Sequence, residues 1–309
     1  MKTVVTGGAG FVGANLVKRL LDQGADVTVI DDLSSGFRSN LAGLNVEFIE
    51  GSILDDTAIA SIHDADAVVH LAAVPSVPRS VKDPVTSHNA NATGTLRVLE
   101  AARKNNAHVI VASSSSVYGA NPILPKVETM CPMPVSPYAV SKLATESYAL
   151  SYQRVYDLPT LAFRFFNIFG PLQAPGHAYA AVVPAFTHAA VNGEPLIVHG
   201  DGEQTRDFTF VGTVIDTIVD AIDRRVTADS PVNLAFGTRY SLLDLIERIE
   251  GEVGHTVERQ HVGTREGDVR DSQSDSTLLT SLFPNIVPVE LGPGLHDTIE
   301  WMKSHEEQV

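Results

Sequence analysis

The sequence predicts an α/β fold, a doubly wound parallel sheet with a smaller C-terminal α/β lobe. Three observations lead to this prediction. Short β-branched runs alternate with helical patterns over the first two-thirds of the chain. A glycine-rich turn joins the first such run to the first helical pattern. The last third is less regular, and glycine and proline pairs mark turns between its helical patterns.

Six runs predict strands, and helical patterns lie between them. The expected strands are Thr3–Thr6, Asp26–Ile30, Val46–Ile49, Ala67–His70, His108–Ala112 and Thr160–Phe165. The expected helices are Val12–Gln23, Asp55–Ile62, Val85–Lys104, Pro137–Tyr156, Thr213–Arg225, Ser241–Gly251 and Gly294–Ser304. Because no flexible linker separates the two parts, we expect residues 1–166 and 167–309 to form closely packed lobes, with segments near 207–237 returning to the first lobe.

Composition limits the classes of function. The 309 residues carry 37 acidic and 22 basic side chains, a formal net charge of −15, which argues against general binding to nucleic acid or to an anionic membrane. The lone Cys131 cannot form an internal disulfide and favours a reducing compartment. No basic and apolar leader pattern precedes the first strand, and no apolar stretch reaches the roughly 18 residues of a membrane span. We therefore expect a cytoplasmic protein, and no metal site is predicted.

The first turn has the features of a dinucleotide site. Gly7, Gly10 and Gly13 allow a tight turn, a close approach of the backbone to a pyrophosphate and close packing of helix on strand. The free amides and dipole of the following helix favour the negative charge. Asp31 closes the second strand, where a carboxylate binds the adenosine ribose and repels a 2′-phosphate. The pattern predicts a Rossmann-type fold that binds NAD rather than NADP.

A second group of residues predicts oxidoreductive chemistry on a hydroxyl. Ser113–Ser116 follow the fifth expected strand, at the sheet edge where ligands bind. Tyr138 and Lys142 are spaced by four positions and therefore share one face of a helix. A nearby ammonium and an oxidised nicotinamide would lower the pKa of the phenol, which is near ~10 when free. A serine hydroxyl can then relay a proton between the substrate and the phenolate.

At this point the sequence resembles a known family. The motifs that carry the resemblance are TGGAGFVG at 6–13, DDLSSG at 31–36, HLAA at 70–73, SSSSVYG at 113–119, YAVSK at 138–142, FRFFNIFGP at 163–171, GDGEQTRDF at 200–208 and REGDVRDSQSD at 265–275. They look like an NAD-dependent epimerase/dehydratase of the extended short-chain dehydrogenase/reductase type. Within that family the chain most resembles bacterial UDP-N-acetylglucosamine and UDP-glucose 4-epimerases.

The resemblance implies roles for particular residues. The catalytic group is Ser114 as hydroxyl relay, Tyr138 as base and Lys142 as its partner. The implied NAD-binding residues are Gly7, Gly10, Phe11, Val12, Gly13, Asp31, Asp32, Ser52, Ile53, Leu71, Ala72, Ala73, Asn91, Tyr138 and Lys142. The implied substrate-binding residues are Ser76, Arg79, Ser80, Ser115, Ser116, Asn167, Gln173, Val182, Arg206, Arg265, Asp268 and Ser272.

Two departures from the family pattern refine these expectations. Gly51-Ser52 stands where relatives often have Gly-Asp, so recognition of adenine should be weaker or made differently. Ser114-Ser115-Ser116 stands where dehydratases usually carry Thr-Asp-Glu. The missing acid and base disfavour the elimination of water.

The implied activity is a UDP-hexose 4-epimerase that passes through a transient 4-keto sugar. Ser272, at a position that lines the sugar pocket in related enzymes, leaves space for an acetamido group. We therefore expect UDP-GlcNAc and UDP-GalNAc as substrates, with UDP-Glc and UDP-Gal as further candidates. A UDP-glucuronate 4-epimerase or decarboxylase remains an alternative, because Arg79 could meet a sugar carboxylate. Another NAD-dependent nucleotide-sugar oxidoreductase is also open, whereas a redox sensor would normally lack the Tyr–Lys pair.

Family relatives pair two helices with their symmetry mates in a four-helix bundle, so the resemblance implies a homodimer. In this chain those helices are the expected segments Val85–Lys104 and Pro137–Tyr156. Leu96, Leu99, Leu143 and Leu150 are the apolar residues that we expect at such an interface.

Overall fold

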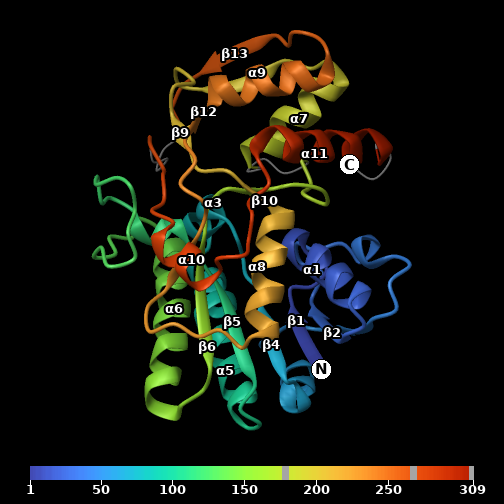
Figure 1. Cartoon of the computed structure of the whole chain (residues 1–309), viewed down its shortest axis with the longest axis vertical. Coiled ribbons are helices and arrows are strands. Elements are labelled where there is room, and N and C mark those ends of the chain that lie inside the picture. Colours follow the sequence, from blue (N-terminus) through green and yellow to red (C-terminus); the bar gives the residue numbers. More distant parts are fainter. Residues whose placement is uncertain (176–180, 265–269, 306–309) are drawn as a thin grey trace.

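The computed structural model describes residues 1–175, 181–264 and 270–305. Within these residues the central sheet has seven strands in the order β11–β6–β5–β4–β1–β2–β3 (Figure 1). Its strands are β1 (Lys2–Thr6), β2 (Asp26–Asp31), β3 (Glu47–Glu50), β4 (Ala67–His70), β5 (His108–Ser114), β6 (Thr160–Phe165) and β11 (Val232–Leu234). All neighbouring strands run parallel. The expected doubly wound sheet is confirmed.

Helices cover both faces of the sheet. Helices α1 (Phe11–Asp22) and α8 (Val211–Asp223) pack against each other on one face. Helices α5 (Gly94–Arg103) and α6 (Pro137–Tyr156) cover the other face (Figure 1). Successive residues of a strand point to opposite faces, so neighbouring strand residues enter different cores. The sheet is therefore buried on both sides, as a parallel sheet requires.

The helical path before α5 contains an irregular turn. It runs through α3 (Val77–Lys82), α4 (Pro84–His88) and a π-helical turn at Asn89–Thr93. The helix expected over Val85–Lys104 is thus helical but interrupted, and such π turns often occur at functional sites. Helix α2 (Asp56–Ala60) continues into a 3-10 turn at Ser61–Asp64, and two further 3-10 turns span Arg38–Leu41 and Ser115–Tyr118.

A second group of elements lies beyond the carboxyl ends of the strands (Figure 1). Helices α7 (Val182–Asn192), α9 (Leu242–Val253) and α11 (Leu291–Ser304) pack on one another. Short strand pairs join them: β8 (Leu196–His199) with β13 (Arg259–Val262), β9 (Thr205–Arg206) with β12 (Tyr240–Ser241), and β7 (Ile168–Phe169) with β10 (Thr209–Phe210). Helix α10 (Thr277–Leu282) instead packs beside β11.

One of the leucines expected at a dimer interface, Leu99, belongs to the core instead, whereas Leu96, Leu143 and Leu150 are partly buried. Leu99 lies on the inner face of α5 and is completely buried, and Leu96 of the same helix packs against the same core. Leu143 packs against the cluster that contains Val117 and Phe166. Leu99 therefore stabilises the chain's own fold and is closed to a second copy. The exposed apolar residues of this region include Val81, Val85, Val140, Tyr148, Val155 and Tyr156.

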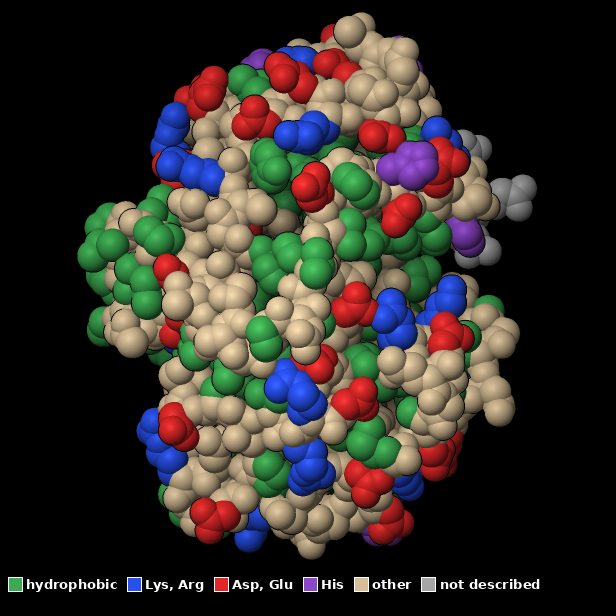
Figure 2. Space-filling view, in the orientation of Figure 1, with side chains coloured by type: hydrophobic (Ala, Val, Ile, Leu, Met, Phe, Trp, Pro, Cys, Tyr) green, Lys and Arg blue, Asp and Glu red, His purple; other side chains and the backbone are tan. Residues whose placement is uncertain are grey.

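The surface carries charges of both signs. Acidic and basic side chains are interspersed over the face shown in Figure 2. Hydrophobic side chains gather on the protruding segment at the left of that view, where Ile123, Met133 and Val135 are exposed. Among the described residues, no helix is both long and apolar enough to cross a membrane.

Candidate functional site

The glycine loop lies where β1 ends and α1 begins, beside β4. The strand order reverses between β1 and β4, which is the place where sheets of this type bind ligands. Gly7 has a φ of 72°, and a Cβ added there would lie 2.6 Å from the Ala72 nitrogen. A Cβ on Gly13 would lie 2.2 Å from the Gly7 oxygen. No side chain fits at either position, so the turn is lined by backbone atoms.

The N-terminus of α1 is suited to an anion. Its N-cap residue is Gly10, and no side chain caps the helix there. Phe11 and Val12 form the first turn, whose amides have no partner within the helix. Together with the helix dipole, these amides fit the pyrophosphate of NAD.

Asp31 is held beside this loop by backbone amides. Its two carboxylate oxygens accept hydrogen bonds from Ala9 N (2.9 Å) and Leu33 N (2.9 Å). Burial raises the pKa of Asp31, while these two hydrogen bonds oppose the shift. The carboxylate is fixed at the end of β2, as ribose binding requires. Asp32 is exposed instead and accepts from Ser34 N (3.0 Å).

The other expected cofactor residues follow the ends of β3 and β4. Leu71 N donates to Thr6 O (3.0 Å) and Ala72 N to Thr6 Oγ1 (3.3 Å), which hold the segment containing Ala73 near the glycine loop. Ile53 is buried and Ser52 N donates to the Asp55 carboxylate (2.9 Å). These residues line the same edge of the sheet as the glycine loop.

The three expected catalytic residues come together from β5 and α6. Ser114 ends β5, where its hydroxyl accepts from Ser116 N (3.2 Å), and its side chain lies close enough to Tyr138 at the start of α6 to lower the pKa of that phenol. Lys142 follows one turn later, with Nζ 6.0 Å from the centre of the Tyr138 ring. The ammonium donates to Ala112 O (2.8 Å), which ties α6 to the end of β5. The three residues, which are separated in the sequence, thus form a compact group at the carboxyl edge of the sheet.

Burial dominates the pKa values of Tyr138 and Lys142. Burial raises the pKa of Tyr138, and the hydrogen bond with Ser114 only partly opposes this shift. Burial also lowers the pKa of Lys142 to about 8. Burial thus opposes the lowering of the Tyr138 pKa that is expected from Lys142 and oxidised nicotinamide together, because desolvation penalises the phenolate. A positive charge brought by oxidised nicotinamide would act in the opposite direction.

Two expected ligand-binding residues make contacts inside the protein. Asn91, in the π turn, donates to Ser141 Oγ (2.9 Å) and accepts from Val74 N (2.8 Å). Ser80 has no exposed surface; its hydroxyl donates to Val77 O (2.7 Å) and accepts from Tyr138 N (3.0 Å). Ser80 therefore positions the backbone of Tyr138 and is not open to a substrate in this structure, contrary to its expected role.

The residues expected around the sugar lie on several segments. Ser76 caps α3 by accepting from Arg79 N (3.2 Å), and Val182 begins α7. Ser115 starts the 3-10 turn after β5. Among the described residues, Ser116 Oγ and Gln173 Oε1 are buried polar atoms without a hydrogen-bond partner. Buried polar atoms of this kind are rare, and a polar ligand could satisfy them.

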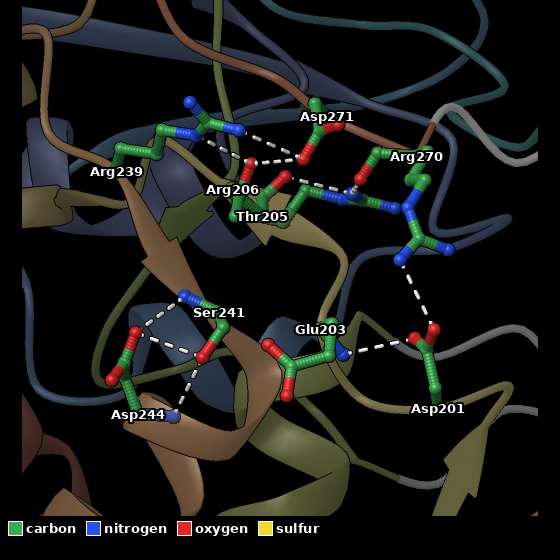
Figure 3. A network of polar contacts seen from close by, with 9 residues as sticks. All are labelled: Asp201, Glu203, Thr205, Arg206, Arg239, Ser241, Asp244, Arg270 and Asp271. Atoms are coloured by element: carbon green, nitrogen blue, oxygen red, sulfur yellow. Dashed lines mark hydrogen bonds and ion pairs between the residues drawn. The ribbon is translucent and has the colours of Figure 1, made fainter.

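Several of the expected substrate-binding residues lie at strand β9 and its neighbours. Arg206 donates to Thr205 O (2.8 Å) and Arg270 O (3.0 Å), so its guanidinium spans β9 and the segment after residue 269 (Figure 3). Ser272 N donates to Thr205 O (3.1 Å), which places Ser272 beside β9. Asn167, with a φ of 23°, donates to Asp207 O (3.3 Å). Arg265 and Asp268 lie outside the described residues.

Asp207 organises this region but was not predicted from the sequence. Its buried carboxylate accepts hydrogen bonds from Gly237 N, Thr238 Oγ1, Ser274 N and Ser274 Oγ, at 2.8 to 3.1 Å. Burial raises its pKa. Asp207 thereby joins three chain segments next to Arg206 and Ser272. The signal in the sequence was a carboxylate within the apolar run Asp207–Phe210, which has to find donors when it is buried.

A second polar cluster stabilises the outer side of β9. Thr205 Oγ1 donates to Asp271 (2.7 Å), and Arg239 binds both Thr205 Oγ1 (3.1 Å) and Asp271 (3.3 Å) (Figure 3). Arg270 pairs with Asp201 farther out. These contacts hold the segment that carries Ser272 against β9.

Comparisons with known proteins agree with this geometry. Residues 3–235 match the model of the NAD dependent epimerase/dehydratase family. The UDP-glucose 4-epimerase of Mycolicibacterium smegmatis is 38% identical, over 98% of this chain and 99% of that protein.

Two solved structures resemble the whole chain. The UDP-N-acetylglucosamine 4-epimerase of Methanobrevibacter ruminantium, solved with UDP-N-acetylmuramic acid, has a TM-score of 0.93 and 36% identity and covers 98% of both chains. The UDP-glucuronic acid 4-epimerase of Bacillus cereus, solved with UDP-glucuronic acid and NAD, has a TM-score of 0.90 and 29% identity, covering 98% of this chain and 99% of that one.

Proposed function

Because the chain belongs to the NAD-dependent epimerase/dehydratase family, we propose that it is a UDP-hexose 4-epimerase that interconverts UDP-GlcNAc and UDP-GalNAc, with UDP-Glc and UDP-Gal as further substrates. One observation carries the proposal: Ser114 at the end of β5, with Tyr138 and Lys142 one turn apart on α6, lies at the same sheet edge as the glycine loop. A hydride acceptor and a proton acceptor can thus face one carbinol.

The residues present fit NAD. The glycine loop offers uncapped amides to a pyrophosphate, and Asp31 is fixed where a ribose would lie. When bound, NAD supplies a reversible hydride acceptor beside carbon 4 of the sugar. We assign residues 1–166, with the returning segments near 207–237, to the NAD-binding lobe and the rest of 167–309 to the UDP-sugar lobe.

The protein's own groups would handle the proton. Ser114 would pass the proton of the sugar 4-hydroxyl to Tyr138 and return it after the ring has turned. Lys142 would favour the charged form of Tyr138 and hold the nicotinamide ribose. Arg206 and Asn167 would grip the diphosphate, so that the UDP stays bound while the transient 4-keto sugar rotates.

Ser272 is the residue that favours an N-acetylated sugar. Its small side chain is partly buried beside β9, and a serine there leaves room that a large side chain would fill. An N-acetyl group can use such room, whereas a hexose without it does not need it. The preference for N-acetylated sugars rests on this residue.

The proposal is tested by incubating purified protein with NAD and, in parallel, UDP-GlcNAc, UDP-Glc or UDP-glucuronic acid, and following products by NMR. We expect UDP-GalNAc to form without net NADH, and UDP-Gal to form from UDP-Glc. Net NADH accumulation would contradict epimerisation. No conversion of either hexose by protein with NAD bound would contradict the substrate assignment.

Enlarging residue 272 should narrow the substrate range. In Ser272→Tyr we expect kcat/KM for UDP-GlcNAc to fall at least about tenfold while that for UDP-Glc changes less than about threefold, because the ring occupies the acetamido space. Ser281→Tyr, on the exposed side of α10, is the matched control and should leave both rates unchanged. Equal losses on the two sugars would argue against a pocket role for Ser272.

A UDP-glucuronate 4-epimerase or decarboxylase is the second candidate. Arg79 favours it, because this partly buried cation precedes Ser80, whose hydroxyl binds the Tyr138 amide. A sugar carboxylate near Tyr138 could then pair with its guanidinium. Conversion of UDP-glucuronic acid with no conversion of the hexoses would select this alternative.

We also propose a cytoplasmic homodimer. The free, exposed thiol of Cys131 suits a reducing compartment. The contacting helices α4 and α6 expose Val85 (66%), Val140 (51%) and Tyr148 (38%), and a second copy of the same face would cover them.

Val85→Asp should shift the protein toward the monomer in sedimentation analysis, because a buried unpaired carboxylate opposes association. Val287→Asp is the matched control, since Val287 is 82% exposed and lies between α10 and α11, in a segment that bonds to α8 through Val289 N and Thr213 Oγ1. A wild-type protein that sediments as a monomer would contradict the dimer.

A further inference from the structure

A buried ion pair joins β6 to α6, outside the proposed catalytic group of Ser114, Tyr138 and Lys142. Arg164 on β6 donates from Nη2 to Glu146 Oε1 (2.6 Å) and from Nε to Glu146 Oε2 (3.0 Å). The two side chains are only 2% and 3% exposed. Burying two charges is costly unless the geometry is good and the remaining atoms are bonded. A buried ion pair next to the catalytic residues is therefore expected to have a function that offsets this cost.

The second partner of Glu146 indicates that function. Ser113 Oγ donates to Glu146 Oε2 (2.7 Å) and also lies 3.3 Å from Lys142 O. Ser113 directly precedes Ser114 in the chain, and Glu146 follows Lys142 by one helical turn. The carboxylate thus links the residue before the relay serine to the helix that carries Tyr138 and Lys142.

Strand geometry transmits this link to Ser114. Neighbouring strand residues point to opposite faces, so fixing the side chain of Ser113 on α6 also fixes the direction of Ser114. In the sheet Ser113 pairs with Arg164 and Ser114 with Phe165. The same arginine therefore borders the strand end and orients the carboxylate that holds it.

Other contacts keep the arginine in place. The Arg164 guanidinium carbon lies 4.6 Å from the centre of the Tyr118 ring, and Tyr118 OH donates to Asn233 Oδ1 (2.7 Å). With a fixed Arg164, the Glu146 carboxylate has one orientation and presents Oε2 to Ser113. An apolar pair could fill the same space but would offer Ser113 no acceptor.

We propose that Glu146 and Arg164 are positioning residues which, through Ser113, hold the hydroxyl of Ser114 within hydrogen-bond reach of Tyr138. The proposal rests on the proposed epimerase function and extends it to residues outside the catalytic group. The hydrogen bond with Ser114 lowers the Tyr138 pKa against the effect of burial. Losing the alignment should therefore raise the pKa of the catalytic phenol.

The test is Ser113→Ala, which removes only the link and leaves the ion pair intact. In the protein with NAD bound, we expect kcat at neutral pH to fall roughly 3- to 10-fold, the worth of one hydrogen bond. KM should stay within about twofold and the acid limb of the kcat–pH profile should move to higher pH. Ser113→Thr keeps the hydroxyl and should restore the wild-type profile.

The matched control is Ser87→Ala. Ser87 is also buried, and its hydroxyl donates to Asp83 O (3.1 Å) one turn earlier in α4. Loss of this hydroxyl should leave the pH profile unchanged. A general loss of stability would affect both variants alike, whereas positioning predicts a shifted acid limb in Ser113→Ala alone.

A second readout separates this proposal from the proposed function. The phenolate absorbance of Tyr138 can be titrated as the difference between each protein and its Tyr138→Phe counterpart, with NAD bound and no sugar present. We expect a higher Tyr138 pKa in Ser113→Ala. If no UDP-sugar is converted, the epimerase assignment fails while this titration still decides the positioning role. An unchanged Tyr138 pKa in Ser113→Ala would overturn the proposal.

Discussion

Tyr138→Phe is expected to lower kcat for UDP-hexose epimerisation by about 10³-fold, within the range for loss of a positioned acid or base. This equals about 4 kcal/mol of transition-state stabilisation. The phenol is the proposed acceptor beside Ser114, and its removal leaves the proton of the sugar hydroxyl without an acceptor. KM should change little, because the UDP is held elsewhere. The loss is measured by NMR conversion of UDP-GlcNAc and UDP-Glc.

A binding measurement and a control variant show whether the loss of kcat comes from the missing phenol hydroxyl. NAD and UDP should bind Tyr138→Phe with wild-type affinity in calorimetry, since one hydroxyl has been removed. Tyr156→Phe, an exposed tyrosine at the other end of α6, is the matched control and should keep full activity. A Tyr138→Phe protein with more than roughly a tenth of wild-type kcat would show that another group takes the proton.

Arg164→Met is expected to lower the free energy of unfolding by about 3–5 kcal/mol, the usual cost of leaving one partner of a buried ion pair uncompensated. The variant leaves the Glu146 carboxylate 3% exposed without its cation. The free energy is measured by urea unfolding of the protein without cofactor, with the thermal midpoint as a second measure.

The double variant Glu146→Gln with Arg164→Met should recover most of that loss, because no unpaired charge remains buried. Lys303→Met breaks the exposed pair of Lys303 with Glu300 and should cost less than about 1 kcal/mol. A double variant as unstable as Arg164→Met would contradict the electrostatic explanation and indicate lost packing against Tyr118. Although the double variant should regain stability, we expect its kcat to stay low, because Ser113 has lost the charged acceptor Glu146.

The course of the main chain was largely predictable from local signals. The helix expected over Pro137–Tyr156 and the strands expected over Ala67–His70 and Thr160–Phe165 have the same bounds in the structure, and the other four expected strands differ by one or two residues at their ends. Helix α7 and strand β11 were not predicted. Helix α7 is continuously apolar along much of its length, which gives little helical periodicity, and β11 is recognisable only by its pairing with β6.

The candidate site divides in the same way. Local patterns in the sequence were enough to predict the parallel sheet, the glycine loop with Asp31, and the order and spacing of Ser114, Tyr138 and Lys142. These features depend on turn geometry and helical periodicity, which act over a few residues.

The packing of the folded chain was needed to show that burial raises the pKa of Tyr138, that Ser80 is closed to solvent and that Leu99 belongs to the core. It alone also identified Glu146 as the partner of Arg164, although a cation in the apolar strand Thr160–Phe165 indicated that a partner must exist. Burial and long-range pairing depend on how distant segments pack, so no local pattern contains them.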